Sequence, residues 1–365
     1  MNDSVTSVLH AAHQGRGADF VVYSGWTWVT TFGDVDAEYA AIRNGVSMWD
    51  VYGLQKFDVS GPDSAMAIQT VFANDVLGMP VGRVRYGAFV NETGAIVDDG
   101  TVFKLADDHF WVMANSVSTG DYIREHAHGM DASITFRTHE MPDISLQGPG
   151  SRELLQRLTT IDLAGLRYYQ FLPERVTVAG VPVWLLRTGF TGDLGFELIP
   201  DQDDAVTLWN RLADEGAVPV GVDAVGIARI EAGFVIIGND YEPYESSPFD
   251  VSMDRVTATD KDLPVIGMDA LRAAAASPSR RLKTLRVAGV ALPEAGASVR
   301  QGDRIVGTLT SPALSPSLGV IGLAVLETPA SGDGTILSVD LPSGTAEAVV
   351  DCLSIIDPSR SLRTS

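Results

Sequence analysis

The feature that most constrains the fold is a glycine-rich segment at residues 187–198, which leads into an apolar run carrying one acid. Its glycines allow backbone conformations that other residues adopt only with strain, so a turn is predicted. They are Gly189, Gly192 and Gly195. Phe196 and Leu198 favour a half-buried strand, and Glu197 lies between them. Burying this acid without a donor is costly, so the segment alone favours a solvated acid on the strand's polar face.

The elements predicted around this segment indicate an α+β fold. A hairpin is predicted at residues 175–186, because two strand-like runs flank Ala179-Gly180. Apolar residues at helical spacing predict helices at residues 62–72, 149–158, 203–215 and 222–232. Strands and helices alternate irregularly and hairpin signals are frequent, which disfavours a doubly wound parallel sheet.

The residue pattern of the sequence changes after residues 273–281, a stretch of small and basic residues. Five short β-like runs follow, separated by Gly, Pro, Ser and Asp, as is typical of a small β-barrel or sandwich. They are residues 282–290, 304–310, 319–326, 335–341 and 346–350. A chain of 365 residues exceeds one ordinary core, so a domain boundary is predicted here.

Composition excludes several functions. The formal net charge is −21, which argues against nucleic acid or an anionic membrane as partner. No run approaches a membrane-spanning length. Cys352 is the sole cysteine, which excludes an intrachain disulfide and suits the cytoplasm. Histidine spacing fits no metal site, and P-loop, dinucleotide and serine-hydrolase signatures are absent, so no metal, ATP or NAD is expected.

Two adjacent acids, Asp98 and Asp99, follow an apolar strand start. Neighbouring residues of a strand point to opposite faces, so only one of the pair is expected to face inward. An inward carboxylate could stabilise a cation or accept a proton. The alternative is an Asp-Gly turn at Gly100 with both acids solvated, and spacing alone favours it.

The first 55 residues are dense in aromatic side chains. Such side chains could line a pocket for a flat heterocycle or a methyl-bearing cation, although core packing is the alternative for each one. They are Tyr23, Trp26, Trp28, Phe32, Trp49 and Tyr52.

Nine blocks in one order, within residues 20–355, resemble the glycine cleavage T-protein superfamily of folate-dependent aminomethyltransferases and their demethylase relatives. The blocks are residues 24–26, 46–51, 73–76, 86–99, 146–149, 187–198, 229–233, 265–271 and 310–316. The resemblance implies a three-domain cloverleaf around a central hole that binds tetrahydrofolate, with a small C-terminal β-barrel. Residues 1–275 would form the folate-binding region, as two α+β subdomains, and residues 282–365 the barrel.

The same resemblance assigns site residues. Asp98 matches the family's catalytic aspartate, which assists one-carbon transfer. Glu197 matches the glutamate that hydrogen-bonds the pterin ring. Tyr86 and Asn115 fall on other cofactor-binding positions.

Three departures from the T-protein pattern favour a demethylase. Val225 stands where T-proteins carry a folate-contacting arginine, and Gly53 replaces a histidine. Residues 245–250 resemble a block of methyl-removing relatives. We therefore predict an enzyme that demethylates a small aryl methyl ether, betaine or sulfonium compound, giving 5-methyltetrahydrofolate, with Trp26 and Tyr52 binding the substrate.

Two other functions remain open. One is the aminomethyltransferase of glycine cleavage, which acts with a lipoyl carrier protein. The other is a non-catalytic folate-binding protein, which is disfavoured because residues 231–240 lack the cysteine of that group. The oligomeric state is left open.

Overall fold

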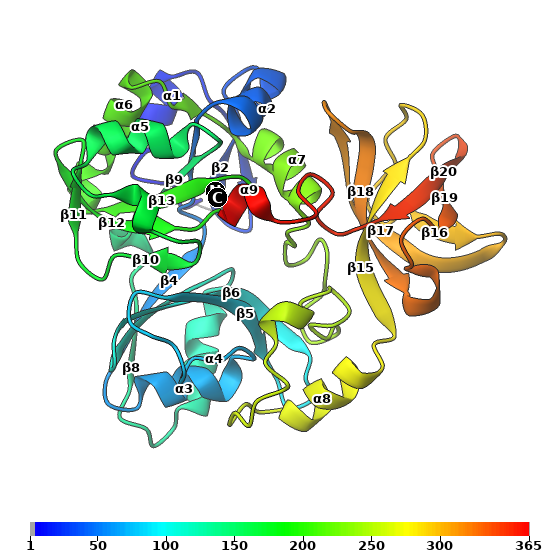
Figure 1. Ribbon diagram of the computed structural model, residues 1–365, viewed down its shortest axis with the longest axis horizontal. Helices are drawn as coiled ribbons and strands as arrows, with labels where there is room; N and C mark the ends of the chain where they lie inside the picture. Colours follow the sequence, from blue (N-terminus) through cyan, green and yellow to red (C-terminus); the bar gives the residue numbers. More distant parts are fainter. Residues whose placement is uncertain (1–3, 365) are drawn as a thin grey trace.

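The computed structural model describes residues 4–364, which form three lobes (Figure 1). The first lobe is built on a seven-stranded sheet in the order β10-β12-β13-β9-β3-β14, with β11 paired to β12. Its strands are β3 (Ser47–Asp50), β9 (Ile144–Gln147), β10 (Gln170–Phe171), β11 (Val176–Val178), β12 (Val181–Arg187), β13 (Gly195–Pro200) and β14 (Val218–Pro219). A separate hairpin joins β1 (Asp19–Tyr23) to β2 (Trp26–Thr31).

The helices of the first lobe cover the apolar face of its sheet. Leu146 and Phe196 of the sheet pack there in one core with Leu155 and Trp209 of the helices. The lobe's helices are α1 (His10–Gly15), α2 (Val35–Asn44), α5 (Ser151–Leu158), α6 (Ala205–Asp214) and α7 (Val222–Ala232). The opposite face of the sheet carries Glu197 and faces the second lobe.

The second lobe is a five-stranded sheet in the order β5-β6-β7-β4-β8, with two helices on its outer face. The strands are β4 (Gln55–Ser60), β5 (Val84–Val90), β6 (Ile96–Ala106), β7 (His109–Ala114) and β8 (Ser133–Phe136); the helices are α3 (Ser64–Val71) and α4 (Ser118–His126). Its inner face packs on the first sheet through apolar side chains, among them Phe103 and Met113 against Leu186 and Ile199. The inner faces of the two sheets therefore meet between the lobes.

The third lobe is a closed six-stranded barrel, which confirms the predicted C-terminal barrel. Its strands are β15 (Arg280–Val287), β16 (Ser298–Gln301), β17 (Arg304–Ser315), β18 (Gly319–Glu327), β19 (Ile336–Leu341) and β20 (Gly344–Asp351). Helix α8 (Met268–Ala276) precedes the barrel, and α9 (Ser361–Thr364) follows it and returns to the centre of the molecule (Figure 1). There the Arg187 guanidinium donates to the Arg363 carbonyl at 3.2 Å. The short 3-10 helices are η1 (Thr138–Glu140), η2 (Leu163–Gly165), η3 (Gln202–Asp204), η4 (Asp254–Val256) and η5 (Thr328–Ala330).

The α+β class, the four helices and the hairpin are confirmed. Strand β16 was missed because its four residues alternate weakly between polar and apolar. The division at residues 275–282 stays a prediction. Among the described residues, no helix has the length and apolar character needed to cross a membrane.

The glycines of residues 187–198 only partly serve the purpose predicted for them, which was to supply backbone freedom. Only Gly192 has a positive φ, of 82°, and so uses glycine's backbone freedom. Gly189 and Gly195 serve another purpose, because a Cβ at either position would collide with the Gln147 side chain. That amide donates to the Thr188 carbonyl at 3.2 Å, so the two glycines make room for a buried polar contact.

Candidate active site

Glu197 lies on the inner face of the first-lobe sheet, in register with Ser145 of β9, which in turn pairs with Trp49 of β3. The Thr188 hydroxyl donates to Glu197 Oε2. Burial raises the pKa of Glu197, while the Thr188 bond and the charge of Lys56 oppose the rise. The structure therefore departs from the solvated acid that the segment alone favoured: Glu197 is half-buried and donor-paired.

Asp98 and Asp99 are both buried, at 0% and 7% exposure, on an unbroken β6. The alternative of a solvated Asp-Gly turn is wrong, although the two side chains do point to opposite faces of the sheet, as strand alternation predicts. Both are buried because helices cover one face of this sheet and the first lobe covers the other. Gly100 continues the strand, where a Cβ would collide with the Met113 carbonyl.

Asp98 holds the segment that leads into α4. Its Oδ2 accepts from the Ser116 backbone N–H at 2.9 Å, the Asn115 N–H at 3.1 Å and the Thr119 hydroxyl at 2.5 Å. Its Oδ1 accepts from Asn115 Nδ2 at 2.9 Å. Burial raises the pKa of Asp98 against these donors, which lower it. Both carboxyl oxygens are thus engaged by donors of the chain itself.

Asp99 faces the inner side, where two tyrosines hold it. Tyr86 donates to Asp99 Oδ2 at 2.8 Å, and the hydroxyl of Tyr241 donates to Oδ1. Asn115 Nδ2 lies 3.1 Å from Oδ1 and so bridges the two acids. Burial, with the adjacent charge of Asp98, raises the pKa of Asp99 to about 7. A carboxyl with that pKa gains and loses a proton near neutral pH.

Tyr169 lies between strand β5 of the second lobe and strand β12 of the first: its carbonyl accepts from the Val84 N–H at 3.0 Å, and its N–H donates to the Arg187 carbonyl at 2.9 Å. The pKa of Tyr169 is raised well above its usual value by burial and by Tyr168, and the charge of Glu197 adds to the rise. Tyr169 in turn raises the pKa of Tyr86. Tyr169 has a φ of 59°, a left-handed conformation that bulky residues rarely adopt and that often marks a functional site. Asp99, Tyr86, Tyr169 and Glu197 therefore belong to one interior site between the two sheets.

The predicted substrate residues, Trp26 and Tyr52, lie together in an aromatic cluster. Their ring centroids are 5.4 Å apart, and Trp26 also stacks on His139 at 5.9 Å. Tyr52 is buried, and its hydroxyl donates to the Thr27 carbonyl. A role in holding the substrate stays a prediction.

Arginines gather at a recess of about 650 Å³ lined by Arg83, Arg167 and Tyr168. Burial and the positive charges of Arg85 and Arg167 lower the pKa of Arg83. Burial and the positive charges of Arg363 and Arg255 likewise lower the pKa of Arg360. Within residues 4–364, no acid forms an ion pair with Arg83, Arg167, Arg255 or Arg360. In a chain of net charge −21, this arginine cluster is suited to an anion.

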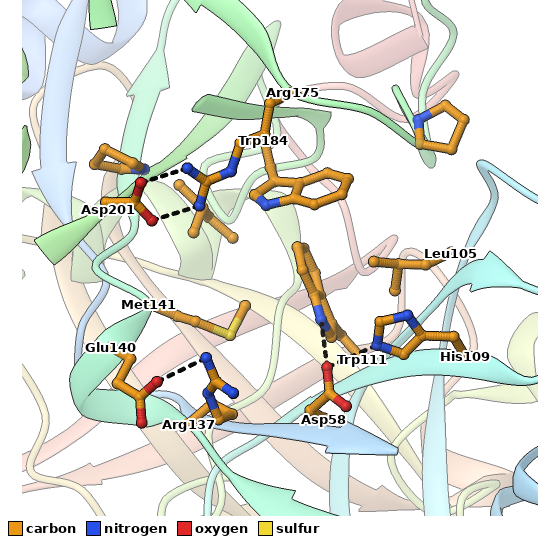
Figure 2. A pocket seen from close by; sticks show the side chains of 13 residues that line it. Asp58, Leu105, His109, Trp111, Arg137, Glu140, Met141, Arg175, Trp184 and Asp201 are labelled. Atoms are coloured by element: carbon orange, nitrogen blue, oxygen red, sulfur yellow. Dashed lines mark hydrogen bonds and ion pairs between the residues drawn. The ribbon is translucent and has the colours of Figure 1, made fainter. Parts of the chain in front are cut away.

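A second cavity, of about 280 Å³, is lined by residues of both sheets, among them Trp111 of β7 and Trp184 of β12 (Figure 2). Its charged side chains satisfy one another: Arg175 pairs with Asp201, Arg137 with Glu140, and Asp58 with His109 and Trp111 (Figure 2). No charged side chain of this lining is left without a partner, so we place the active site at the interior cluster.

Sequence reasoning missed four interior residues, Lys56, Asp143, Tyr169 and Tyr241. A lysine at the start of a buried strand, and a Pro-Asp pair before another, were signals of buried charge. The tyrosines gave no such signal, because only tertiary packing brings them to Asp99 and Glu197.

The departures from the T-protein pattern have structural reasons. Val225 is buried with Tyr39 and Ile42 in the packing of α2 on α7. Gly53 lies under the Trp28 indole, which a Cβ would strike. Residues 245–250 form a turn that is buried at Phe249 and Asp250, and Asp250 Oδ2 accepts from the Ser247 N–H at 2.9 Å. None of these three features requires a methylated substrate.

Comparison with known proteins identifies the family. The chain matches the GCVT N-terminal domain over residues 9–261 and the glycine cleavage T-protein C-terminal barrel domain over residues 280–356. An aminomethyltransferase of Streptomyces avermitilis is 34% identical over 341 residues, covering 90% of this chain and 91% of that protein. One of Thermotoga petrophila is 31% identical over 350 residues, covering 94% and 95%.

The fold agrees with these matches. The crystal structure of glycine cleavage system aminomethyltransferase T from Bartonella henselae superimposes with a TM-score of 0.86 at 23% identity, covering 96% of this chain and 98% of that one. The relatives are named aminomethyltransferases, which contradicts the predicted demethylase and favours the first alternative. The chain belongs to the glycine cleavage T-protein family.

Proposed function

We propose that the protein is an aminomethyltransferase, which takes an aminomethyl group from a lipoyl carrier protein and delivers its carbon to tetrahydrofolate. The observation that carries the proposal is the interior site between the two sheets, where Tyr86 holds Asp99 and Tyr169 lies between β5 and β12, in a chain whose relatives are named aminomethyltransferases. A cytoplasmic location is part of the proposal.

The residues present fit tetrahydrofolate. Its pterin ring is rich in hydrogen-bond donors, and Glu197 supplies a carboxylate acceptor on the inner face of the sheet. Its glutamate tail carries carboxylates, and the arginine cluster at Arg83 and Arg167 supplies positive charge without acidic partners. Tetrahydrofolate supplies the nitrogen nucleophiles that accept the one-carbon unit.

Asp99 is the side chain we assign to proton transfer. The transferred carbon would exchange its C–S and C–N bonds for two bonds to folate nitrogens, and the two protons that these nitrogens lose would pass to the carrier thiol and to the departing ammonia. A carboxyl with a pKa of about 7 exchanges protons efficiently at neutral pH. Tyr86 and Tyr241 fix its position by donating to its two oxygens.

We assign a positioning role to Asp98, which the sequence predicted as the catalytic acid. Its two oxygens already accept from Asn115, Ser116 and Thr119. This bonding holds the loop before α4, and with it the Asn115 amide that contacts Asp99. Asn115 itself we assign to positioning rather than to direct cofactor contact.

The test is reconstitution with purified components. The protein is incubated with tetrahydrofolate and an aminomethylated lipoyl carrier, and methylenetetrahydrofolate and ammonia are measured in equal amounts. The carrier without its lipoyl group is the control and should give neither product. Binding of tetrahydrofolate without any product would support the non-catalytic alternative and contradict the proposal.

A further inference from the structure

Asp143 is a buried acid that the proposed mechanism does not use. It lies directly before β9 and is 1% exposed. Both of its carboxyl oxygens are without a hydrogen-bond partner within residues 4–364. A buried charged group without donors is strongly unfavourable, so a fold that keeps one requires an explanation.

Asp143 belongs to the inner face of the sheet. It precedes Ser145 by two residues, and alternation along the chain places both side chains on one face. Ser145 is in register with Glu197 on β13. Burial raises the pKa of Asp143 well above its usual value, and the charge of Glu197 raises it further. Two carboxyl groups thus lie near each other in the interior.

Lys56 is the matching cation. It is 0% exposed, and its Nζ donates to the Val51 and Leu54 carbonyls at 3.1 Å each. An ammonium carries three protons, so one donor is left over. Burial lowers the pKa of Lys56, while the charges of Asp143, Asp50 and Glu197 raise it. The oxygens of Asp143 and Glu197 outnumber the one spare donor of Lys56, which favours a ligand rich in donors.

A simple counterion role does not account for this geometry. A buried ion pair offsets the loss of water through direct, hydrogen-bonded contact. Lys56 instead donates to backbone carbonyls, and no ion pair of 4.0 Å or less joins it to Asp143 among the described residues. The site therefore presents free acceptors on Asp143 and a free donor on Lys56.

We propose that Asp143 and Lys56 complete the pterin subsite and select an aminopyrimidinone edge. Such an edge presents adjacent N–H donors beside one carbonyl acceptor. Asp143 and Glu197 accept from the donors, and the remaining Lys56 proton is donated to the carbonyl. This assignment rests on the proposed function, because it takes tetrahydrofolate as the ligand.

The experiment measures equilibrium binding by tryptophan fluorescence and calorimetry with the full chain. The probes are tetrahydrofolate and its 2-desamino analogue, which lacks one donor of the edge. The variants are Asp143→Asn, Lys56→Met and the paired replacement Lys56→Met with Asp143→Leu, which removes both buried charges together. Asp58→Asn is the matched control, since Asp58 lies on the same strand as Lys56 but is bound by His109 and Trp111.

We expect the wild type to bind tetrahydrofolate about tenfold to hundredfold more tightly than the analogue, as for one charge-assisted hydrogen bond. Asp143→Asn should weaken tetrahydrofolate binding by that factor and bind both probes about equally. The paired replacement should do the same while thermal unfolding shows a folded protein, and Asp58→Asn should bind like the wild type.

The outcomes distinguish a failure of this inference from a failure of the proposed function. If Asp143→Asn and the paired replacement keep wild-type affinity and wild-type preference, Asp143 only balances the charge of Lys56 and the inference is overturned, while the proposed function stands. If the wild type fails to bind tetrahydrofolate, the proposed function and this inference fall together.

Discussion

Asp98 and Asp99 are neighbours on β6, yet Asp98 accepts from the Ser116 N–H at 2.9 Å and Asp99 from the Tyr86 hydroxyl at 2.8 Å on the other side of the sheet. Adjacent strand residues point to opposite faces, so the same residue type has two environments. Asp98 binds a loop of its own lobe, and Asp99 faces the first lobe. The predictions below follow from this division and from the groups around it.

Asp99→Asn should lower kcat by about 10²-fold or more, because it removes the group assigned to proton transfer. Asp98→Asn should instead lower the free energy of unfolding by about 1–3 kcal/mol, because an amide cannot accept from all of these donors. Steady-state kinetics and urea unfolding of both variants check this. If Asp98→Asn loses turnover at unchanged stability, Asp98 is the catalytic acid, as the sequence predicted.

The pH dependence should report Asp99. If its carboxylate accepts the proton, kcat should rise with pH through about 7, and Asp99→Asn should remove this limb. For stability, the folded pKa lies above the ordinary 3.8, so the folded state holds a proton that the unfolded state has lost. The stabilising contribution is therefore complete below about pH 4 and lost as the pH rises through about 7. Asp99→Asn should stabilise the protein more at pH 8 than at pH 5, by calorimetry, and equal effects would argue against the raised pKa.

Glu197→Gln should weaken tetrahydrofolate binding by about tenfold to hundredfold, because the acceptor loses its charge. Thr188→Val is the matched variant: it removes the hydroxyl that donates to Glu197 but keeps the acid. Thr188→Val should lose less affinity than Glu197→Gln, as measured by calorimetry. This difference would distinguish a residue that positions the acid from the acid that binds the pterin. Unchanged affinity in Glu197→Gln would remove this residue from the pterin site.

The arginine cluster should bind the acidic tail of the folate. Arg83→Gln and Arg167→Gln should reduce affinity for tetrahydrofolate carrying several glutamates more than for the single-glutamate form, because each added carboxylate draws on the same positive charge. Raising the salt concentration should narrow the difference between the two ligands. An equal effect on both ligands at low salt would place the tail elsewhere.

Val225→Arg should not create a folate contact. Val225 is 3% exposed beside Tyr39 and Ile42, so an arginine there would be a buried charge without a partner. We expect a loss of about 3 kcal/mol or more in the free energy of unfolding, checked by chemical denaturation. A stable variant with tighter folate binding would show that the helix α7 surface opens to the site.

The sequence by itself determined much of the fold. Helical spacing located α5 and α7, and the Ala179-Gly180 turn located the β11–β12 hairpin, because these signals depend on neighbours along the chain. The run of nine blocks determined the family, which the comparisons confirm. The prediction of a demethylase rested on three local departures from the family pattern, at Val225, Gly53 and residues 245–250. Each of them turned out to be a packing adjustment.

Only the tertiary structure decided which groups share the site. The local sequence predicted Glu197 as a solvated acid, because residues 187–198 carry no information about the second sheet that covers this face. The roles of Asp98 and Asp99 depend on α4 and on Tyr241, which lie far along the chain. Lys56 and Asp143 come near Glu197 only when β4, β9 and β13 are assembled. Burial and proximity set their pKa values and hydrogen bonds, and both are properties of the folded chain.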